Sequence, residues 1–363
     1  MEPKKVVVAM SGGVDSSVAA ALLKEDGYDV IGITMNLFSF PPEVCRSEAL
    51  RSCCGWRAKE DAGRVAKALG IPHYVADFRQ EFERRVIQDF CQEYGLGRTP
   101  NPCIRCNQHI KFDLLLEKAR KLKADWMATG HHARVKYNPR LGRYLLKKGK
   151  DREKDQSYFL YPLTQAQLSR ILFPVGEMTK KEVRETARRM GLPVADKEES
   201  QEICFVPDGN YAEFLKIRIP ESFGPGPIVD LSGRVLGEHR GIVHFTIGQR
   251  RGMRIAAPHP LYVIALDGGK NAVVVGRDED LYQKRLLASR LNFVSAEEFK
   301  RPIRARVKVR FRHREARAVI HPLGRGEAEV EFETAQRAVT PGQAVVFYKR
   351  DVVLGGGTIE KAL

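Results

Sequence analysis

The stretch Lys5–Leu23, KVVVAMSGGVDSSVAAALL, decides the fold. Its opening residues, KVVVAM, have the continuous apolar character of a buried strand. The loop SGGVDSS follows over 11–17, and Val18–Lys24 then has the pattern of a helix that Gly27 would end. Glycines let a backbone approach an anion closely, and a helix N-terminus with serine hydroxyls offers donors to it. The stretch therefore predicts a strand, a phosphate-binding loop and a helix.

Two common phosphate loops are excluded by the same residues. The loop has no lysine in the position required by G-x-x-x-x-G-K-[ST], and it lacks G-x-G-x-x-G. A plain glycine turn of an α/β protein is the alternative. The order of strand, loop and helix favours an anion site over that alternative.

Strands and helices alternate along the first half of the chain. Further strands are expected at Asp29–Asn36, Pro72–Ala76 and Asp125–Thr129, and further helices at Lys59–Leu69, Gln80–Tyr94 and Lys111–Leu122. This alternation predicts a mostly parallel sheet with helices on both faces, whose ligands bind at the carboxyl ends of the strands.

The second half of the chain has a different residue pattern. T-x-x-E at Thr179–Glu182 predicts a capped helix ending near Met190, and from about Phe223 glycines, prolines and short β-rich runs dominate. We predict an α/β domain over 1–210, a small β-rich central domain over 211–285 and a C-terminal β-barrel over 286–363.

Composition limits the classes of function. The 363 residues carry a formal net charge of +16, which favours a polyanionic partner. No apolar run is long enough to cross a bilayer, and the start MEPKKV leaves no room for a signal peptide, so a cytoplasmic protein is expected. Seven cysteines, an odd number, argue against a structural disulfide framework.

Two cysteines stand in the segment RTPNPCIRCN, 98–107, just before a predicted helix. Its prolines predict an extended loop, and Arg105 with the helix N-terminus favours the thiolates of Cys103 and Cys106. Such thiolates suit a nucleophile or a soft metal, for which Cys204 is the candidate distant partner. Cys91 is expected to be a small buried hydrophobe.

Three further cysteines, Cys45, Cys53 and Cys54, follow the second strand in a segment that we interpret as a mobile insertion near the site rather than as a metal site.

Basic residues alternate with other, mostly apolar, residues over 304–314 in the C-terminal part of the chain. Six cations recur at every second residue and predict one basic face of a single strand that contacts phosphates, rather than a plain solvated face. They are Arg304, Arg306, Lys308, Arg310, Arg312 and Arg314.

SGGVDS resembles the signature of PP-loop ATP pyrophosphatases, the adenine nucleotide alpha-hydrolase-like, Rossmann-like enzymes that split ATP between the α and β phosphates. The resemblance implies that the loop cradles ATP, that Asp15 favours Mg²⁺, and that two later positions contact the nucleotide. The implied positions are Ala9, Met10, Ser11, Gly12, Gly13, Val14, Asp15, Ser16, Met35 and Gly130.

Several blocks in order together resemble the tRNA-specific 2-thiouridylase family over nearly the whole chain. They are SGGVDS (11–16), TPNPCIRCN (99–107), ATGHH (128–132), KDQSYFL (154–160), SQEICFV (200–206), FTIGQRRG (245–252) and VLGGGTI (353–359). Family members place sulfur on C2 of the wobble uridine of tRNA after ATP has adenylated O2. The resemblance implies a PP-loop domain, a small central domain and a C-terminal barrel.

The resemblance also implies residue roles. Cys106 is the nucleophile and Cys204 carries a persulfide, supplied by a cysteine desulfurase or a sulfur-relay protein. Contacts to tRNA are implied for Asn101, Pro102, Cys103, Lys154, Asp155, Gln156, Arg310 and Phe311.

One position departs from the family pattern. Many members have NPD where this chain has Asn101-Pro102-Cys103, so a proton-transfer role at this position is in doubt. Cys103, Cys106 and Cys204 could instead hold a [4Fe–4S] cluster with one open iron, so the persulfide and cluster routes both stay open. A PP-loop amide-forming ligase and a non-catalytic iron–sulfur RNA-binding protein are the rival functions.

Overall fold

The computed structural model describes residues 3–39, 56–198, 203–206, 209–296 and 298–363. The predicted insertion with Cys45, Cys53 and Cys54 lies outside these residues. The chain forms two compact units, one of residues 1–86, 103–209 and 351–353 and one of residues 87–102, 210–350 and 354–363. We call them unit 1 and unit 2.

The parallel sheet predicted from the first half is confirmed in unit 1. Its five strands lie in the order β3-β2-β1-β4-β7, and the paired neighbours all run parallel. The strands are β1 (Lys5–Ala9), β2 (Asp29–Asn36), β3 (His73–Asp77), β4 (Trp126–Thr129) and β7 (Ile171–Leu172). β1 is central, and the chain changes direction across the sheet between β1 and β4.

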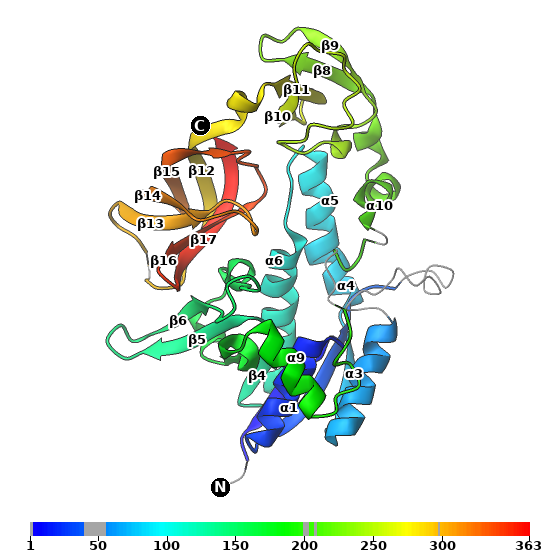
Figure 1. The fold of residues 1–363 in the computed structure, drawn as a ribbon, viewed down its shortest axis with the longest axis vertical. Helices are drawn as coiled ribbons and strands as arrows, with labels where there is room; N and C mark the ends of the chain where they lie inside the picture. Colours follow the sequence, from blue (N-terminus) through cyan, green and yellow to red (C-terminus); the bar gives the residue numbers. More distant parts are fainter. Residues whose placement is uncertain (1–2, 40–55, 199–202, 207–208, 297) are drawn as a thin grey trace. The chain divides into compact units, whose positions relative to one another are not determined.

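Helices cover this sheet. On one face, Val6 and Val8 of β1 pack in one core with α1 (Val14–Glu25), α3 (Trp56–Leu69) and α9 (Lys180–Arg189) (Figure 1). Val7 points the opposite way and is also fully buried, as expected of a strand covered on both sides. α1 begins at Val14, one turn earlier than the predicted Val18 and inside the predicted loop, directly after Gly13.

The cysteine segment is not the extended loop that its prolines suggested. α6 (Pro102–Cys106) continues into a π-helical segment, η2 (Asn107–Leu115), and α7 (Leu116–Lys121), so helix begins at Pro102 instead of Lys111. Proline suits the first turn of a helix because its fixed φ is helical and its missing N–H would have no partner there.

The predicted helix Gln80–Tyr94 also contains a π-helical turn. It is built from α4 (Arg79–Phe82), η1 (Glu83–Ile87) and α5 (Gln88–Gly95). Cys91 is buried in α5, as expected.

Unit 1 contains further short elements. β5 (Ala133–Asn138) and β6 (Arg143–Lys148) form an antiparallel hairpin, and Val352 pairs with Lys147 of β6. The remaining elements are η3 (Ser157–Leu160), α8 (Gln165–Leu168) and η4 (Pro174–Glu177).

The predicted capping box of α9 is confirmed. Thr179 accepts from the backbone N–H of Glu182, and the Glu182 carboxylate accepts from the backbone N–H of Thr179.

Unit 2 contains a small sheet in the order β10-β11-β8-β9. The strands are β8 (Gly226–Asp230), β9 (Val235–His239), β10 (Tyr262–Asp267) and β11 (Ala272–Gly276), with α10 (Tyr211–Arg218), η6 (Pro220–Phe223) and η7 (Ile242–His244) before and between them. Phe90 and Tyr94 of α5 pack their rings on Phe214 and Tyr211 of α10.

A closed barrel completes unit 2. Six strands follow the order β12-β15-β14-β13-β16-β17, and β12 pairs with β17 to close it. They are β12 (Tyr282–Phe293), β13 (Ile303–Lys308), β14 (Ala316–Gly324), β15 (Glu327–Arg337), β16 (Ala344–Lys349) and β17 (Val352–Ala362), preceded by η8 (Asp278–Leu281).

The single basic strand was a wrong prediction. β13 ends at Lys308, and Arg310, Arg312 and Arg314 lie in the turn that leads into β14. The reason is pairing: Val307 already lies opposite Ala316, so the chain must reverse within these residues. Alternation of side chains cannot distinguish a long strand from a strand and its turn.

Within the described ranges, no helix is long and apolar enough to span a membrane.

Candidate active site

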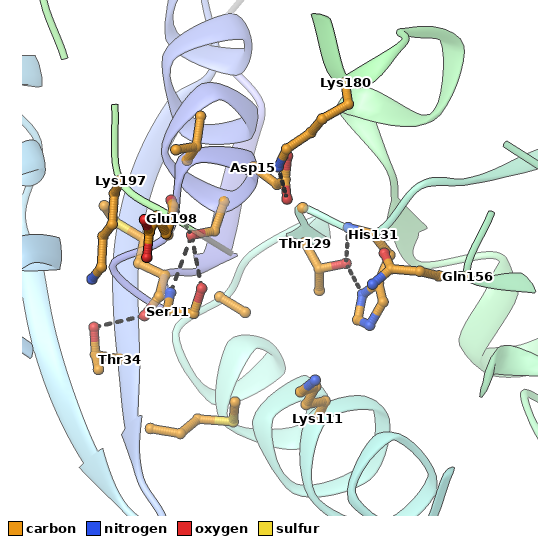
Figure 2. A pocket seen from close by; sticks show the side chains of 17 residues that line it. Ser11, Asp15, Thr34, Lys111, Thr129, His131, Gln156, Lys180, Lys197 and Glu198 are labelled. Carbon is orange, nitrogen blue, oxygen red and sulfur yellow. Dashed lines mark hydrogen bonds and ion pairs between the residues drawn. The ribbon is translucent and has the colours of Figure 1, made fainter. Parts of the chain in front are cut away.

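A cavity of about 290 Å³ lies where the chain changes direction across the sheet of unit 1, at the carboxyl ends of β1 and β4 (Figure 2). This is the position where open α/β sheets bind their ligands. Its lining comprises Ala9, Met10, Ser11, Gly13, Val14, Asp15, Ser16, Thr34, Met35, Lys111, Thr129, Gly130, His131, Gln156, Lys180, Lys197 and Glu198. The structure thus brings together the predicted nucleotide residues, with Gly12 adjoining them in the loop.

Glycine is required at two places beside this cavity. Gly12 has a φ of +69°, and a Cβ there would lie 2.3 Å from the carbonyl oxygen of Ala58. A Cβ on Gly130 would lie 2.5 Å from the backbone nitrogen of Ser16. The two glycines therefore let β4 and α3 approach the loop closely enough to shape an anion cradle.

Hydroxyl groups hold the loop in shape. Ser16 and Ser17 donate to the carbonyl oxygen of Gly13, at 3.1 and 2.8 Å, and Ser16 Oγ accepts from the backbone N–H of Ser11. Thr34 of β2 donates to the carbonyl oxygen of Met10 at 2.8 Å. The loop is thus preorganised by its own side chains.

Asp15 is held by two groups from distant parts of the chain. Lys180 Nζ lies 2.7 Å from Asp15 Oδ1, and His132 Nε2 lies 3.3 Å from the same oxygen. Burial by itself would raise the pKa of Asp15, but the hydrogen bond to His132 and the charge of Lys180 outweigh it, and the pKa lies below its ordinary value. Asp15 is therefore a carboxylate.

Lysines supply the positive charge of the cavity, and the sequence patterns did not reveal them. Lys111, Lys180 and Lys197 all belong to its lining. Lys197 Nζ donates to the carbonyl oxygen of Gly12 at 2.9 Å and pairs with Asp61. The capping box at Thr179 was a usable signal for Lys180, because it places that residue in the first turn of α9. No comparable sequence pattern marks Lys197.

His131 also lines the cavity, but it is an uncharged group. Its Nδ1 lies 2.7 Å from Thr129 Oγ1 (Figure 2). Burial and the nearby Lys111 charge lower the pKa of His131 well below its ordinary value. It can therefore donate or accept one hydrogen bond in the cavity without adding charge.

The predicted sulfur residues lie elsewhere in unit 1. Cys106 is buried, Cys103 is exposed and Cys204 is half-buried in a turn. None of the three belongs to the described lining of the cavity. Across the described residues no group of three or more His, Cys, Asp or Glu side chains is arranged to hold a metal ion.

A buried amide follows Cys106 directly. Asn107 is 2% exposed, and its Nδ2 donates to the carbonyl oxygen of Phe159 at 3.2 Å. This bond ties the cysteine-bearing helix to η3, the element that begins just after Lys154–Gln156.

The residues of that segment have different surroundings. The Asp155 carboxylate is buried and accepts from Gly149 N, Ser157 N and Ser157 Oγ, so it stabilises the segment from inside. Gln156 lines the cavity and accepts from the backbone N–H of His132. A contact of this segment with tRNA stays a prediction.

Four other predicted tRNA residues, Asn101, Pro102, Arg310 and Phe311, lie in unit 2. Pro102 is buried, whereas Asn101, Arg310 and Phe311 are partly exposed. Arg310 and Phe311 both lie in the turn after β13.

A central parallel strand, the SGGVDS loop and a glycine-walled cavity at the carboxyl ends of β1 and β4 define a PP-loop domain, the fold of ATP-utilising enzymes. Three family models match the chain: "tRNA methyl transferase HUP domain" over residues 4–208, "tRNA methyl transferase PRC-barrel domain" over 212–277 and "Aminomethyltransferase beta-barrel domain" over 283–359.

Curated relatives identify the family. The tRNA-specific 2-thiouridylase MnmA of Carboxydothermus hydrogenoformans is 53% identical over 99% of this chain and 98% of its own length. The proteins of that name from Symbiobacterium thermophilum and Moorella thermoacetica are 52% and 53% identical, covering 99% and 98% of this chain and 93% and 99% of their own. The chain belongs to the tRNA-specific 2-thiouridylase family.

Proposed function

We propose that this protein replaces O2 of the wobble uridine of tRNA with sulfur carried by its own cysteines. The family membership makes it an ATP-dependent tRNA-uridine 2-sulfurtransferase. The observation that carries the proposal is the cavity at the end of β1, where the SGGVDS loop and three lysines gather around one space. The products are 2-thiouridine, AMP and diphosphate.

The cavity residues suit ATP and the adenylation step. Backbone N–H groups at the start of α1 and the lysine charges suit phosphates, and Gly12 and Gly130 allow the close backbone approach that shapes the cradle. Asp15 is the residue that would hold Mg²⁺ beside the phosphates. Attachment of AMP to O2 turns a poor leaving group into a good one.

Two thiols complete the reaction. Cys204 carries the sulfur as a persulfide, and that sulfur attacks C2 directly or after Cys106 has released it as sulfide. In the direct route the attack on C2 expels AMP with O2, and the Cys106 thiolate then attacks Cys204 Sγ, which releases the 2-thiouridine sulfur and forms the Cys106–Cys204 disulfide. In the sulfide route the same disulfide forms first, and the released sulfide then expels AMP from C2. Either way, external thiols must reduce the disulfide by two electrons. Cys106 is the last residue of α6 and is buried, whereas Cys103 lies in the first turn of that helix and is exposed.

Two alternatives belong to this proposal. A [4Fe–4S] route through Cys103, Cys106 and Cys204 would need the three thiols to gather around one cluster. A PP-loop ligase that forms amides would use the same cavity but would leave the cysteines unused.

Partners follow from the chemistry. The net charge of +16 and the basic residues of β13 and its turn favour phosphate contacts with the tRNA, whose target base must be splayed out to be reached. The chain offers no chemistry that makes persulfide, so a cysteine desulfurase or a relay protein supplies it. The cytoplasm is proposed because tRNA is modified there.

Nucleoside analysis tests the activity. The protein is incubated with unmodified tRNA, MgATP, a cysteine desulfurase and cysteine, and the digested tRNA is analysed by mass spectrometry. We expect 2-thiouridine at the wobble position together with pyrophosphate release that depends on tRNA. Pyrophosphate release without tRNA, or with an amine acceptor in its place, would support the ligase instead.

A further inference from the structure

Arg98 makes an ion-pair cluster in unit 2. It lies on the segment between α5 and Pro102, and its guanidinium donates from Nε to Glu93 at 2.7 Å and from Nη1 to Glu360 at 2.7 Å. Its Nη2 donates to the carbonyl oxygen of Ile359 at 3.3 Å. The three charged side chains are 18%, 13% and 28% exposed, so the pairs are shielded from solvent more than ordinary surface pairs.

Thr99, the residue after Arg98, is hydrogen-bonded to the barrel through its backbone. The N–H of Thr99 donates to the carbonyl oxygen of Pro341 at 2.9 Å, and its carbonyl oxygen accepts from Gln343 Nε2 at 2.8 Å. Gly342, between these two partners, has a φ of +89°, and a Cβ there would lie 3.0 Å from the Thr99 backbone. The turn between β15 and β16 is thus shaped to receive Thr99.

These contacts limit the movement of the cysteine segment that comes next in the chain. Two residues of chain span at most about 7 Å, so Asn101 stays within that distance of an anchored Thr99, and Cys103 within about 14 Å. Glu360 and Ile359 belong to β17, and Pro341–Gln343 to the neighbouring turn, so both anchors are parts of the barrel.

We propose that Arg98 is a positioning residue for sulfur transfer: it fixes the start of the Asn101–Cys106 segment to the barrel, so that tRNA bound by the barrel meets that segment in the reactive arrangement. This inference rests on the proposed function. Arg98 is not among the residues that line the cavity, and we infer that it acts through the segment that it holds.

The test compares three variants with the unaltered enzyme. Arg98→Met removes the whole guanidinium, Glu360→Gln removes the charge of one partner, and the double variant removes both. Arg337→Met is the matched control, because Arg337 pairs with Asp278 at 2.8 Å in the same unit without touching the cysteine segment. Thermal unfolding, tRNA affinity, the single-turnover rate of 2-thiouridine formation and alkylation of the exposed Cys103 by iodoacetamide are measured for each.

We expect Arg98→Met to lower the rate about tenfold or more while the tRNA dissociation constant changes less than about twofold. The double variant should be no slower than Arg98→Met, because both changes release the same segment. In the unaltered enzyme tRNA should protect Cys103 from alkylation, and this protection should be lost in Arg98→Met but kept in Arg337→Met.

An unchanged rate and unchanged protection in Arg98→Met would overturn the inference, as would losses that Arg337→Met reproduces. Failure of the proposed function is a separate result: the unaltered enzyme would then form no 2-thiouridine, and the alkylation comparison would still decide whether Arg98 holds the segment.

Discussion

Lys180 Nζ lies 2.7 Å from Oδ1 and 2.8 Å from Oδ2 of Asp15, across a separation of 165 residues in sequence. The pair joins the first turn of α9 to the first turn of α1 at the edge of the cavity. Under the proposed function, Lys180 would bind a phosphate if Mg²⁺ took its place at the Asp15 carboxylate.

Lys180→Met should weaken ATP binding about tenfold, because the cavity loses one of its cations. Isothermal titration with a non-hydrolysable ATP analogue and Mg²⁺ measures this. Lys150→Met is the control: Lys150 pairs with Glu182 of the same helix and is 47% exposed outside the cavity lining. Equal affinities for the two variants would remove Lys180 from the nucleotide site.

Asp15 should contribute to the pH dependence of stability. Its pKa is lowered in the folded protein, so the stabilisation is complete above the ordinary carboxyl pKa and is lost as pH falls through the lower folded value. The unfolding temperature, measured between pH 6 and about pH 3, should therefore fall less steeply in Asp15→Asn than in the unaltered protein. Parallel curves would show that the Lys180 and His132 contacts do not stabilise the carboxylate.

Gly130→Ala should abolish ATP-dependent activity and lower stability, since the new Cβ would collide with the backbone of Asp15 and Ser16. Gly63→Ala is a matched control within α3, where a Cβ has its nearest neighbour at 3.9 Å. That control should be neutral or stabilising by up to about 1 kcal/mol, because alanine is the better helix former. Nucleotide titration and thermal unfolding are measured for both variants. An active Gly130→Ala would contradict the close approach of Gly130 to the backbone of Asp15 and Ser16.

Replacing Arg310 and Arg312 with alanine should weaken tRNA binding and make its salt dependence less steep. Each lost phosphate contact lowers the slope of log K against log salt by about 0.7 to 0.9. Lys181→Ala, an 85% exposed cation of α9, serves as the control and should leave the slope unchanged. A normal slope after the double replacement would exclude the turn after β13 from the tRNA interface.

Cys103→Asp separates the two sulfur routes. It restores the aspartate that many family members carry, so the persulfide route predicts retained thiolation, whereas a cluster held by three cysteines predicts its loss. Iron and sulfide analysis of anaerobically purified protein accompanies the assay. Bound iron in the unaltered protein, lost together with activity in Cys103→Asp, would contradict the persulfide route.

The strand, loop and helix around Ser11–Ser16 could be predicted because local pattern determines them: buried strands are continuous apolar runs, and the loop is marked by its glycines. The same was true of the capping box at Thr179. Such features depend on residues that are neighbours in sequence.

Contacts between distant residues could not be predicted. Nothing around Lys180 or Lys197 identifies Asp15 or Gly12 as a partner, and Arg98 gives no sign of Glu360. The prediction that one strand continues through the basic residues after Lys308 was wrong for a related reason. The end of β13 is set by its pairing with β14 and not by the alternation of side chains.

The central claim is that Cys106 and Cys204 transfer the sulfur after ATP has activated the base. Measuring pyrophosphate release and 2-thiouridine with cysteine variants tests this claim most directly. Cys106→Ala and Cys204→Ala enzymes are mixed with tRNA, MgATP and the sulfur donor, and pyrophosphate and 2-thiouridine are measured in the same samples. We predict tRNA-dependent pyrophosphate release without 2-thiouridine for both variants, because the nucleotide cavity is intact and sulfur transfer is not. Normal 2-thiouridine from either variant would contradict the account.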